Sequence, residues 1–203
     1  MADAVNIGWK LGWVLNGKAG AGLLDSYTPE RRGATMDVFA NASKSARFMT
    51  PPTHGWETMR YAALSLALDH DFAGELANPR QMRPYIYSDS PSVLEDDAQF
   101  DTGPEVGNVM ADVKLNQGFL SDAMGAVFTL LCFHQTLADT VAAQISKDAL
   151  GLCVQPVNGR VADIYGGTKT TAYLIQPDGH IAARWRDVSV SKVQKALNVA
   201  LHT

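Results

Sequence analysis

The first 32 residues constrain the fold most, because they contain a helix, a stop signal and the start of a second helix in fixed order. Trp9 and Trp13 add a second apolar stripe to this helix, which is therefore apolar around most of its circumference and belongs in a protein interior. Asn16-Gly17 ends it, since glycine takes the left-handed cap without steric cost. Thr28 and Pro29 open the next helix as N-cap and first helical residue. The main apolar face of the first helix, at helical spacing, is predicted to be Ala4, Ile7, Gly8, Leu11, Val14 and Leu15.

The composition is that of an ordinary globular protein, with 203 residues, 46% hydrophobic and 19% charged residues. This length allows one large or two small domains. The formal net charge of -4 gives no reason to expect nucleic acid or an anionic membrane as a partner. No run approaches the roughly 18 apolar residues of a membrane span, and no secretory signal is visible. Two cysteines outside any C-x-x-C pattern suit a reducing cytoplasm, the predicted location.

The amino-terminal half is predicted to be helical as far as a boundary near Gly103, which divides the chain into residues 1–102 and 103–203. The second helix is predicted to run from Pro29 to Phe48, with an inward face of Met36, Phe39, Ala40 and Ser43. A third helix is predicted over residues 57–71, with an inward face of Met59, Ala62, Ala63 and Leu66. A loop follows, with a short strand at residues 85–87 and an acidic run, Glu95-Asp96-Asp97, as a solvated turn.

The carboxy-terminal half changes to short apolar runs rich in β-forming residues. Its predicted elements are, in order, a strand at 125–133, a helix at 136–148, a strand at 150–157, a hairpin of strands 171–175 and 180–185, and a last helix. Pro177-Asp178-Gly179 supplies the hairpin turn. Ser191-x-x-Gln194 is predicted as a capping box for the last helix, whose inward face is Val190, Val193, Leu197 and Leu201. This order predicts a thioredoxin-like α/β domain after the helical amino-terminal segment.

Motifs along nearly the whole chain resemble one enzyme family. The amino-terminal motif is Asp3-Ala4-x-Asn6-x-x-Trp9-Lys10-Leu11, followed by Leu23-Leu24-Asp25-x-Tyr27-x-x-Glu30-Arg31-Arg32. The carboxy-terminal motifs are Gly103-Pro104-x-x-Gly107, Asp112-Val113-x-Leu115, Phe128-Thr-Leu-Leu131 and Leu174-x-x-Pro177-Asp178-Gly179-His180-x-Ala182-x-Arg184-Trp185. Together they resemble the FAD-dependent aromatic-ring hydroxylases, the flavoprotein phenol and hydroxyphenylpropionate monooxygenases.

The resemblance implies that the chain corresponds to the carboxy-terminal part of such an enzyme, after the flavin-binding domain. The parent reaction would use FAD, NAD(P)H and oxygen to hydroxylate a phenolic ring. The chain alone is expected to be inert, with no catalytic residue, no metal and no cofactor bound. Asp3 and Asn6 lie near the flavin in the relatives and are the candidate cofactor-binding residues. The missing flavin-binding domain is an expected partner, and the thioredoxin-like domain implies subunit contacts.

Two other functions compete with this hypothesis. The chain could be a stand-alone interaction or assembly module with a redox-inactive thioredoxin-like fold. A thiol oxidoreductase is disfavoured, because the loop after the first predicted strand reads Phe133-His134-Gln135-Thr136 and contains no cysteine. Cys132 and Cys153 are predicted to be buried apolar fillers, with a disulfide between them as the minor alternative.

Weaker motifs favour structural roles. Gly20-Ala-Gly22 lacks the preceding strand and third glycine of a dinucleotide site. Ser189-x-x-Lys192 is better explained by helix capping than by catalysis. The five histidines show no metal-ligand spacing. Glu30-Arg31-Arg32 is either a solvated charge run or, as the resemblance implies, a fixed ion pair that ties the helices to the catalytic body.

The first helix also predicts self-association. If the flavin-binding part is missing, the apolar side chains around this helix would be left in water, and large exposed apolar patches usually become contact surfaces. These side chains are Ile7, Trp9, Leu11, Trp13 and Val14. The expected assembly is a homo-oligomer.

Overall fold

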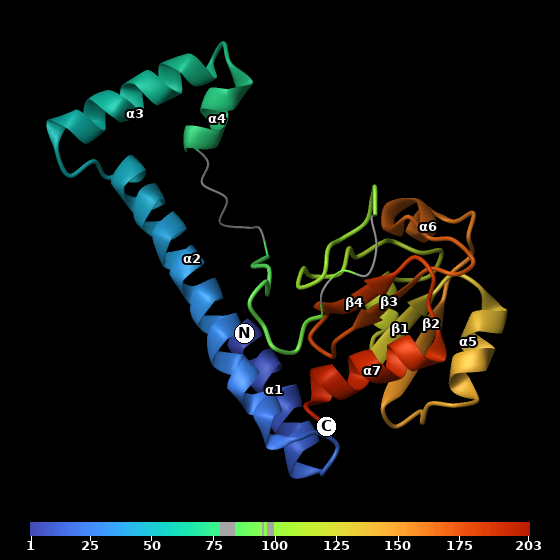
Figure 1. Cartoon of the computed structure of the whole chain (residues 1–203). Helices are drawn as coiled ribbons and strands as arrows, with labels where there is room; N and C mark the ends of the chain where they lie inside the picture. The colour runs from blue at the N-terminus through green and yellow to red at the C-terminus, as the bar shows by residue number, and fades with distance from the viewer. Residues whose placement is uncertain (78–83, 95, 97–99) are drawn as a thin grey trace. The chain divides into compact units, whose positions relative to one another are not determined.

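The computed structural model describes residues 1–77, 84–94, 96 and 100–203, and these form two compact units (Figure 1). The sheet unit comprises Met1–Glu30 and Ile86–Thr203, and the helical unit comprises Arg31–Tyr85. The predicted boundary at Gly103 separates residues 1–102 from a piece, residues 103–203, that is expected to fold by itself. That expectation stays a prediction.

The sheet unit is built on four strands, β1 (Phe128–Cys132), β2 (Leu150–Val154), β3 (Ala172–Ile175) and β4 (Ile181–Trp185). Their order across the sheet is β2-β1-β3-β4. β1 and β2 are parallel, whereas β3 is antiparallel to both β1 and β4. This topology, with a helix between β1 and β2 and another after β4, confirms the thioredoxin-like fold.

Helices cover both faces of the sheet, so every residue of β1, β3 and β4 is buried. One face packs against α1 (Ala2–Leu15), α5 (Gln135–Ala142) and α7 (Val190–Leu201), and the other packs against α6 (Arg160–Tyr165) and the segment that contains the short 3₁₀ helix η2 (Leu120–Ala123). Burial on both faces explains the continuous apolar runs of the central strands.

The last helix begins two residues earlier than the capping-box prediction placed it. Ser189, not Ser191, is the N-cap of α7, and its hydroxyl accepts a hydrogen bond from the Lys192 amide at 3.3 Å. The predicted inward face is confirmed, since Val193, Leu197 and Leu201 are buried and Val190 is partly so.

The first helix buries a different face from the one predicted. Asn6, Lys10 and Trp13 are buried, whereas Leu11 and Leu15 are exposed. Trp13 packs edge-on against Phe128 at 5.6 Å between ring centroids and donates to the Ala126 carbonyl at 3.1 Å. The expectation that Trp9 and Trp13 lack a partner within the chain is therefore wrong, because both rings pack on β1.

The helical unit contains most of α2 (Tyr27–Met49), then α3 (His54–Ala67) and α4 (Asp71–Ala77). α2 follows the 3₁₀ helix η1 (Ala21–Ser26) directly, so Thr28 is not its N-cap. α3 begins after its N-cap Thr53, earlier than the predicted start at residue 57. It also ends at Ala67, before the predicted end at residue 71, where the separate helix α4 begins. The only buried side chains described in this unit are Ala34, Ala63 and Ala73.

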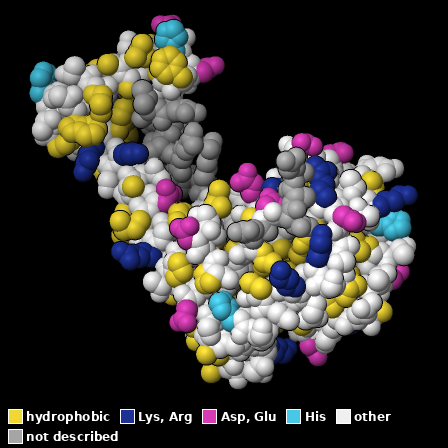
Figure 2. Space-filling view, viewed as in Figure 1, with side chains coloured by type: hydrophobic (Ala, Val, Ile, Leu, Met, Phe, Trp, Pro, Cys, Tyr) yellow, Lys and Arg dark blue, Asp and Glu magenta, His cyan; other side chains and the backbone are white. Residues whose placement is uncertain are grey.

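The predicted inward faces of α2 and α3 are largely exposed. Met36, Phe39, Met59 and Leu66 are exposed by 61, 63, 49 and 44%. Figure 2 shows hydrophobic side chains gathered on the surface of this unit. The unit therefore has large apolar side chains outside and small ones inside.

Two of the remaining segments differ from the sequence-based predictions in smaller ways. Residues 85–87 form no strand, although the Tyr87 amide donates to the Gly107 carbonyl at 2.8 Å. In the acidic run, Asp96 binds Arg184, and Glu95 and Asp97 lie outside the described residues. Within the described ranges, no helix is long and apolar enough to cross a bilayer.

Candidate functional site

A buried group of polar side chains connects the two segments that carry the most extended motifs. We call it the polar cluster, and its members are Asn6, Lys10, Ser26, Glu30, Ser90 and Asp178. α1, η1 and the start of α2 supply four of them, and the β3–β4 turn supplies Asp178. The cluster therefore joins residues that are far apart in the sequence.

The centre of the polar cluster is an ion pair between Lys10 and Glu30, both of whose side chains are fully buried. The Lys10 ammonium also donates to the Ser26 hydroxyl at 2.6 Å, which in turn donates to the Leu23 carbonyl at 2.6 Å. The Ser90 hydroxyl donates to the second Glu30 oxygen at 2.5 Å. Buried charges are tolerated when hydrogen bonds satisfy the remaining lone pairs and protons, as these contacts do.

Asn6 connects the ion pair to the hairpin turn. Its side-chain amide nitrogen donates to Glu30 Oε2 at 2.7 Å and to Asp178 Oδ2 at 2.9 Å. Both of its donors are therefore used inside the sheet unit. Its carbonyl oxygen is buried and has no hydrogen-bond partner among the described residues.

Asp178 is further held by His180. The His180 Nδ1 lies 3.1 Å from Asp178 Oδ1, and the His180 ring stacks on Tyr87 with 3.7 Å between centroids. Burial alone would raise the pKa of Asp178, but the hydrogen bonds and charge of His180, with the Asn6 amide, outweigh it and hold this pKa below its ordinary value. The carboxylate is thus kept charged in the interior.

The structure separates the two candidate flavin-adjacent residues. Asn6 faces the interior, whereas Asp3 is exposed in the first turn of α1. A carboxylate near a helix N-terminus is favoured by the helix dipole whether or not a ligand is near. Their proximity to a flavin stays a prediction. In the charge run that begins at Glu30, Glu30 forms a buried ion pair with Lys10, and Arg32 is exposed. An ion pair that ties the helices to a catalytic body stays a prediction.

Sequence reasoning missed the roles of Lys10 and Asp178. Both lie in the quoted motifs, and Lys10 was the one charged residue in an otherwise apolar stretch of α1. Lys10 lies four residues after Asn6 and three before Trp13, on the buried face of α1, and its spacing from Trp13 is the signal that could have identified it.

The two cysteines are buried and free, as predicted for apolar fillers. Cys132 faces the α5 and α7 side of the sheet, whereas Cys153 faces the α6 side, so the alternative of a disulfide is wrong. Burial, with a smaller effect of Cys153, raises the pKa of Cys132 to about 12, and burial also raises the pKa of Cys153. A thiol of this kind is a poor nucleophile at neutral pH. Across the described residues, no group of three His, Cys, Asp or Glu side chains could hold a metal ion.

The two glycines of Gly20-Ala-Gly22 pack against the end of α7. A Cβ at Gly20 would lie 2.2 Å from the His202 carbonyl oxygen, and the Gly20 amide donates to the Leu201 carbonyl at 2.8 Å. A Cβ at Gly22 would lie 3.1 Å from the His202 ring. These glycines therefore permit a close backbone approach between η1 and α7, which explains the motif without a nucleotide.

Arg184 fixes the chain around Gly103. Its guanidinium donates to Asp96 Oδ2 at 2.7 Å and to the carbonyls of Gly103 and Pro104 at 3.2 and 3.0 Å. Phe100 lies beside this guanidinium, 4.4 Å from its ring centroid to the Arg184 Cζ. The arginine of the last motif therefore has a structural role in the sheet unit.

Known proteins that are similar in sequence to this chain are monooxygenases and hydroxylases. Residues 1–42 match the family described as FAD binding domain. The chain is 33% identical over 195 residues to the 12-dehydrotetracycline 5-monooxygenase/anhydrotetracycline 6-monooxygenase of Streptomyces rimosus, covering 88% of this chain and 34% of that protein. It is 30% identical over 209 residues to aklavinone 12-hydroxylase of Streptomyces purpurascens, covering 96 and 37%.

Solved structures agree in fold. A complex of aklavinone-11 hydroxylase with FAD and aklavinone matches all of this chain and 39% of its own, with a TM-score of 0.66 and 25% identity. The flavin-dependent monooxygenase PieE matches 99% of this chain and 43% of its own, with a TM-score of 0.69 and 22% identity. The chain spans about a third of the length of the curated relatives named above. In sequence and fold, the homologues of this chain are FAD-dependent aromatic-ring hydroxylases, and the chain corresponds to about a third of their length.

Proposed function

We propose that this chain is the carboxy-terminal portion of an FAD- and NAD(P)H-dependent hydroxylase of phenolic rings, and that it is itself non-catalytic and serves subunit contacts. The observation that carries the proposal is the polar cluster. It fastens the segment that matches a FAD binding domain, through Asn6, Lys10 and Glu30, to the hairpin of the thioredoxin-like sheet at Asp178. Such a connection would hold a flavin-binding part and a thioredoxin-like part as one body.

The helical unit gives independent support. Among its described residues only alanines are buried, while Met36, Phe39, Leu68 and Phe72 are exposed by at least 61%. Fully burying one large apolar side chain contributes about 1.5–3 kcal/mol, so this exposure is costly for an isolated protein. A longer hydroxylase offers the additional surface that would cover these side chains.

The described polar groups support a non-catalytic role. Lys10 and Glu30 form an ion pair, and the Asn6 amide bonds both Glu30 and Asp178 inside the sheet unit. The two thiols are protonated at neutral pH. FAD, when bound to the parent enzyme, would supply the hydroxylation chemistry. In this chain Asp3 is the candidate residue that remains at the surface near the α1 N-terminus, where the helix dipole is positive.

We expect the purified 203-residue chain to bind no FAD and to oxidise no NADPH in the presence of phenols. The reason is that a dinucleotide-binding unit needs a strand, a glycine-rich turn and a helix, whereas β1 leads into α5 through Phe133 and His134. Absorbance spectroscopy after incubation with FAD and gel filtration measures the binding. A yellow protein with near-stoichiometric flavin would overturn the non-catalytic role.

The coding DNA upstream of residue 1 separates this proposal from the rival one of a stand-alone interaction module. An in-frame flavin-binding region supports the carboxy-terminal portion of a hydroxylase. Expression of the 203-residue chain from its own start, detected by mass spectrometry of the native protein, supports the stand-alone module.

A further inference from the structure

The outer edge of β2 is an open backbone edge. Within the described part of the chain β2 pairs with β1 alone, at the end of the strand order. The Gln155 amide donates to the Cys132 carbonyl on β1 at 2.9 Å, so alternate residues Gly151 and Cys153 also face β1. The amide and carbonyl groups of Leu152 and Val154 therefore point outward.

This edge lacks the features that usually prevent strands from associating. Natural edge strands are protected by charged side chains, prolines or bulges. The sequence of β2 is Leu-Gly-Leu-Cys-Val, and its pairing with β1 runs without a register shift. Leu152, in the middle of the strand, is 37% exposed.

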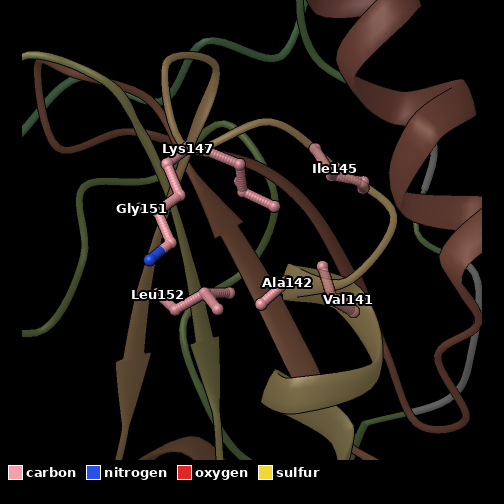
Figure 3. Close-up of a pocket in the computed structure, with 7 residues that line it drawn as sticks. Val141, Ala142, Ile145, Lys147, Gly151 and Leu152 are labelled. Atoms are coloured by element: carbon pink, nitrogen blue, oxygen red, sulfur yellow. The ribbon is translucent and has the colours of Figure 1, made fainter.

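An apolar pocket of about 310 Å³ adjoins this edge on the α5 face of the sheet. Its lining residues are Val141, Ala142, Ile145, Lys147, Leu150, Gly151 and Leu152. Figure 3 shows the Leu152 side chain extending from β2 towards Ala142 of α5. A strand added to β2 would place its own side chains on this face beside the pocket.

We propose that a second copy of this chain pairs its β2 antiparallel to β2 about a two-fold axis at Leu152, and that the Leu152 side chain of each copy enters the pocket of the other. This inference deepens the proposed subunit-contact role by naming its surface. The match is self-complementary, because Leu152 offers one outward donor and one outward acceptor to an identical residue.

The neighbouring residues fit the same axis. Val154 of one copy falls opposite Leu150 of the other, where the Val154 amide finds the outward Leu150 carbonyl; the Leu150 amide is already bonded to Ser146 within its own chain. Lys147 and Asp148 fall opposite Val157 and Pro156, so no like charges face each other. Pro156 limits the ladder to the length of β2.

Light scattering behind size exclusion, over a range of concentrations, tests the proposal on the whole chain. The wild-type chain should form a dimer, and Leu152→Lys should weaken it about tenfold or more by placing two ammonium groups opposite each other. Leu68→Lys changes another exposed leucine and is the matched control, which should leave the dimer intact. A wild-type monomer at every concentration overturns both this interface and the subunit-contact role.

Two further measurements locate the axis. An equimolar mixture of Leu152→Lys and Leu152→Glu should restore a dimer, since position 152 faces itself only across a two-fold axis. Leu152→Cys should form a covalent dimer on mild oxidation, because directly opposed residues lie within disulfide range, whereas Leu68→Cys should not. A dimer that survives Leu152→Lys and gives no Leu152→Cys crosslink overturns the β2 interface but leaves the subunit-contact role to another surface.

Discussion

Lys10 is fully buried beside Glu30, and its ammonium group is also bonded to Ser26. We expect Lys10→Met to lower the free energy of unfolding by about 3–5 kcal/mol, because Glu30 would remain as a buried charge without its cation. Urea unfolding followed by tryptophan fluorescence measures this loss. The exposed Lys18→Met is the matched control, and Lys10→Met combined with Glu30→Gln should be more stable than Lys10→Met alone. Equal stability of wild type and Lys10→Met would contradict the buried ion pair.

Asp178 predicts a specific response to acid. Because its pKa is lower in the folded than in the unfolded chain, its contribution to stability is complete above the unfolded pKa of about 3.9 and is lost as pH falls through the folded pKa. Asp178→Asn should therefore be less stable than wild type at pH 7, and the difference should shrink below about pH 4. Urea unfolding at a series of pH values measures both curves. A difference that stays constant down to pH 2 would argue against a charged Asp178 in the polar cluster.

For individual residues, the sequence predicted only part of the polar cluster. An ion pair at Glu30 was one of two open alternatives, but the burial of Lys10 was missed. The resemblance named Asn6 only as a residue near the flavin, which stays a prediction. Hydrophobic periodicity treats a lysine as a solvent-facing residue, so it selected the opposite face of α1. A buried charge depends on partners from distant segments, here Glu30, and single-helix patterns do not contain them.

Among the elements, η1 and α7 meet at a contact that only glycine allows. We expect Gly20→Ala to destabilise the chain, since the new Cβ would lie 2.2 Å from the His202 carbonyl oxygen and the backbone would have to move. Gly12→Ala is the matched control, because nothing lies within 4 Å of its Cβ position in α1 and a helical alanine is about 0.5–1 kcal/mol more stable than glycine. Thermal unfolding by circular dichroism should move the two melting temperatures in opposite directions. A rise for both variants would show that the contact is loose.

The strands were predicted from short continuous apolar runs bounded by turn residues, and the helices α5 and α7 were predicted from apolar residues at helical spacing. α6 was missed, since six residues between glycines, Arg160–Tyr165, are too few to show a period. The predicted inward faces of α2 and α3 are largely exposed in the described structure, since an apolar stripe indicates that a surface needs covering but not which molecule covers it.

For the molecule as a whole, we expect limited proteolysis to cut between Asn78 and Gly103 and to leave the carboxy-terminal piece intact. The structure adds that residues 1–30 should remain bound to that piece after cleavage at a single site, because Trp13 packs on Phe128 and Asn6 is bonded to Asp178. Size exclusion followed by denaturing electrophoresis should show both fragments in one peak. Prompt digestion of the carboxy-terminal half, or separate elution of the fragments, would contradict this arrangement.

The bond from Asn6 to Asp178 links residues 172 positions apart. A ribosome that adds about 5–20 residues per second needs roughly 10–30 s to make the intervening chain. During that interval α1 has left the exit tunnel while Asp178 is still untranslated, and until Phe128 is made Trp9 and Trp13 lack their ring partner. Ribosome-bound chains that end before these residues should therefore depend on chaperones that hold exposed aromatic segments, and prematurely terminated products should be removed by proteases.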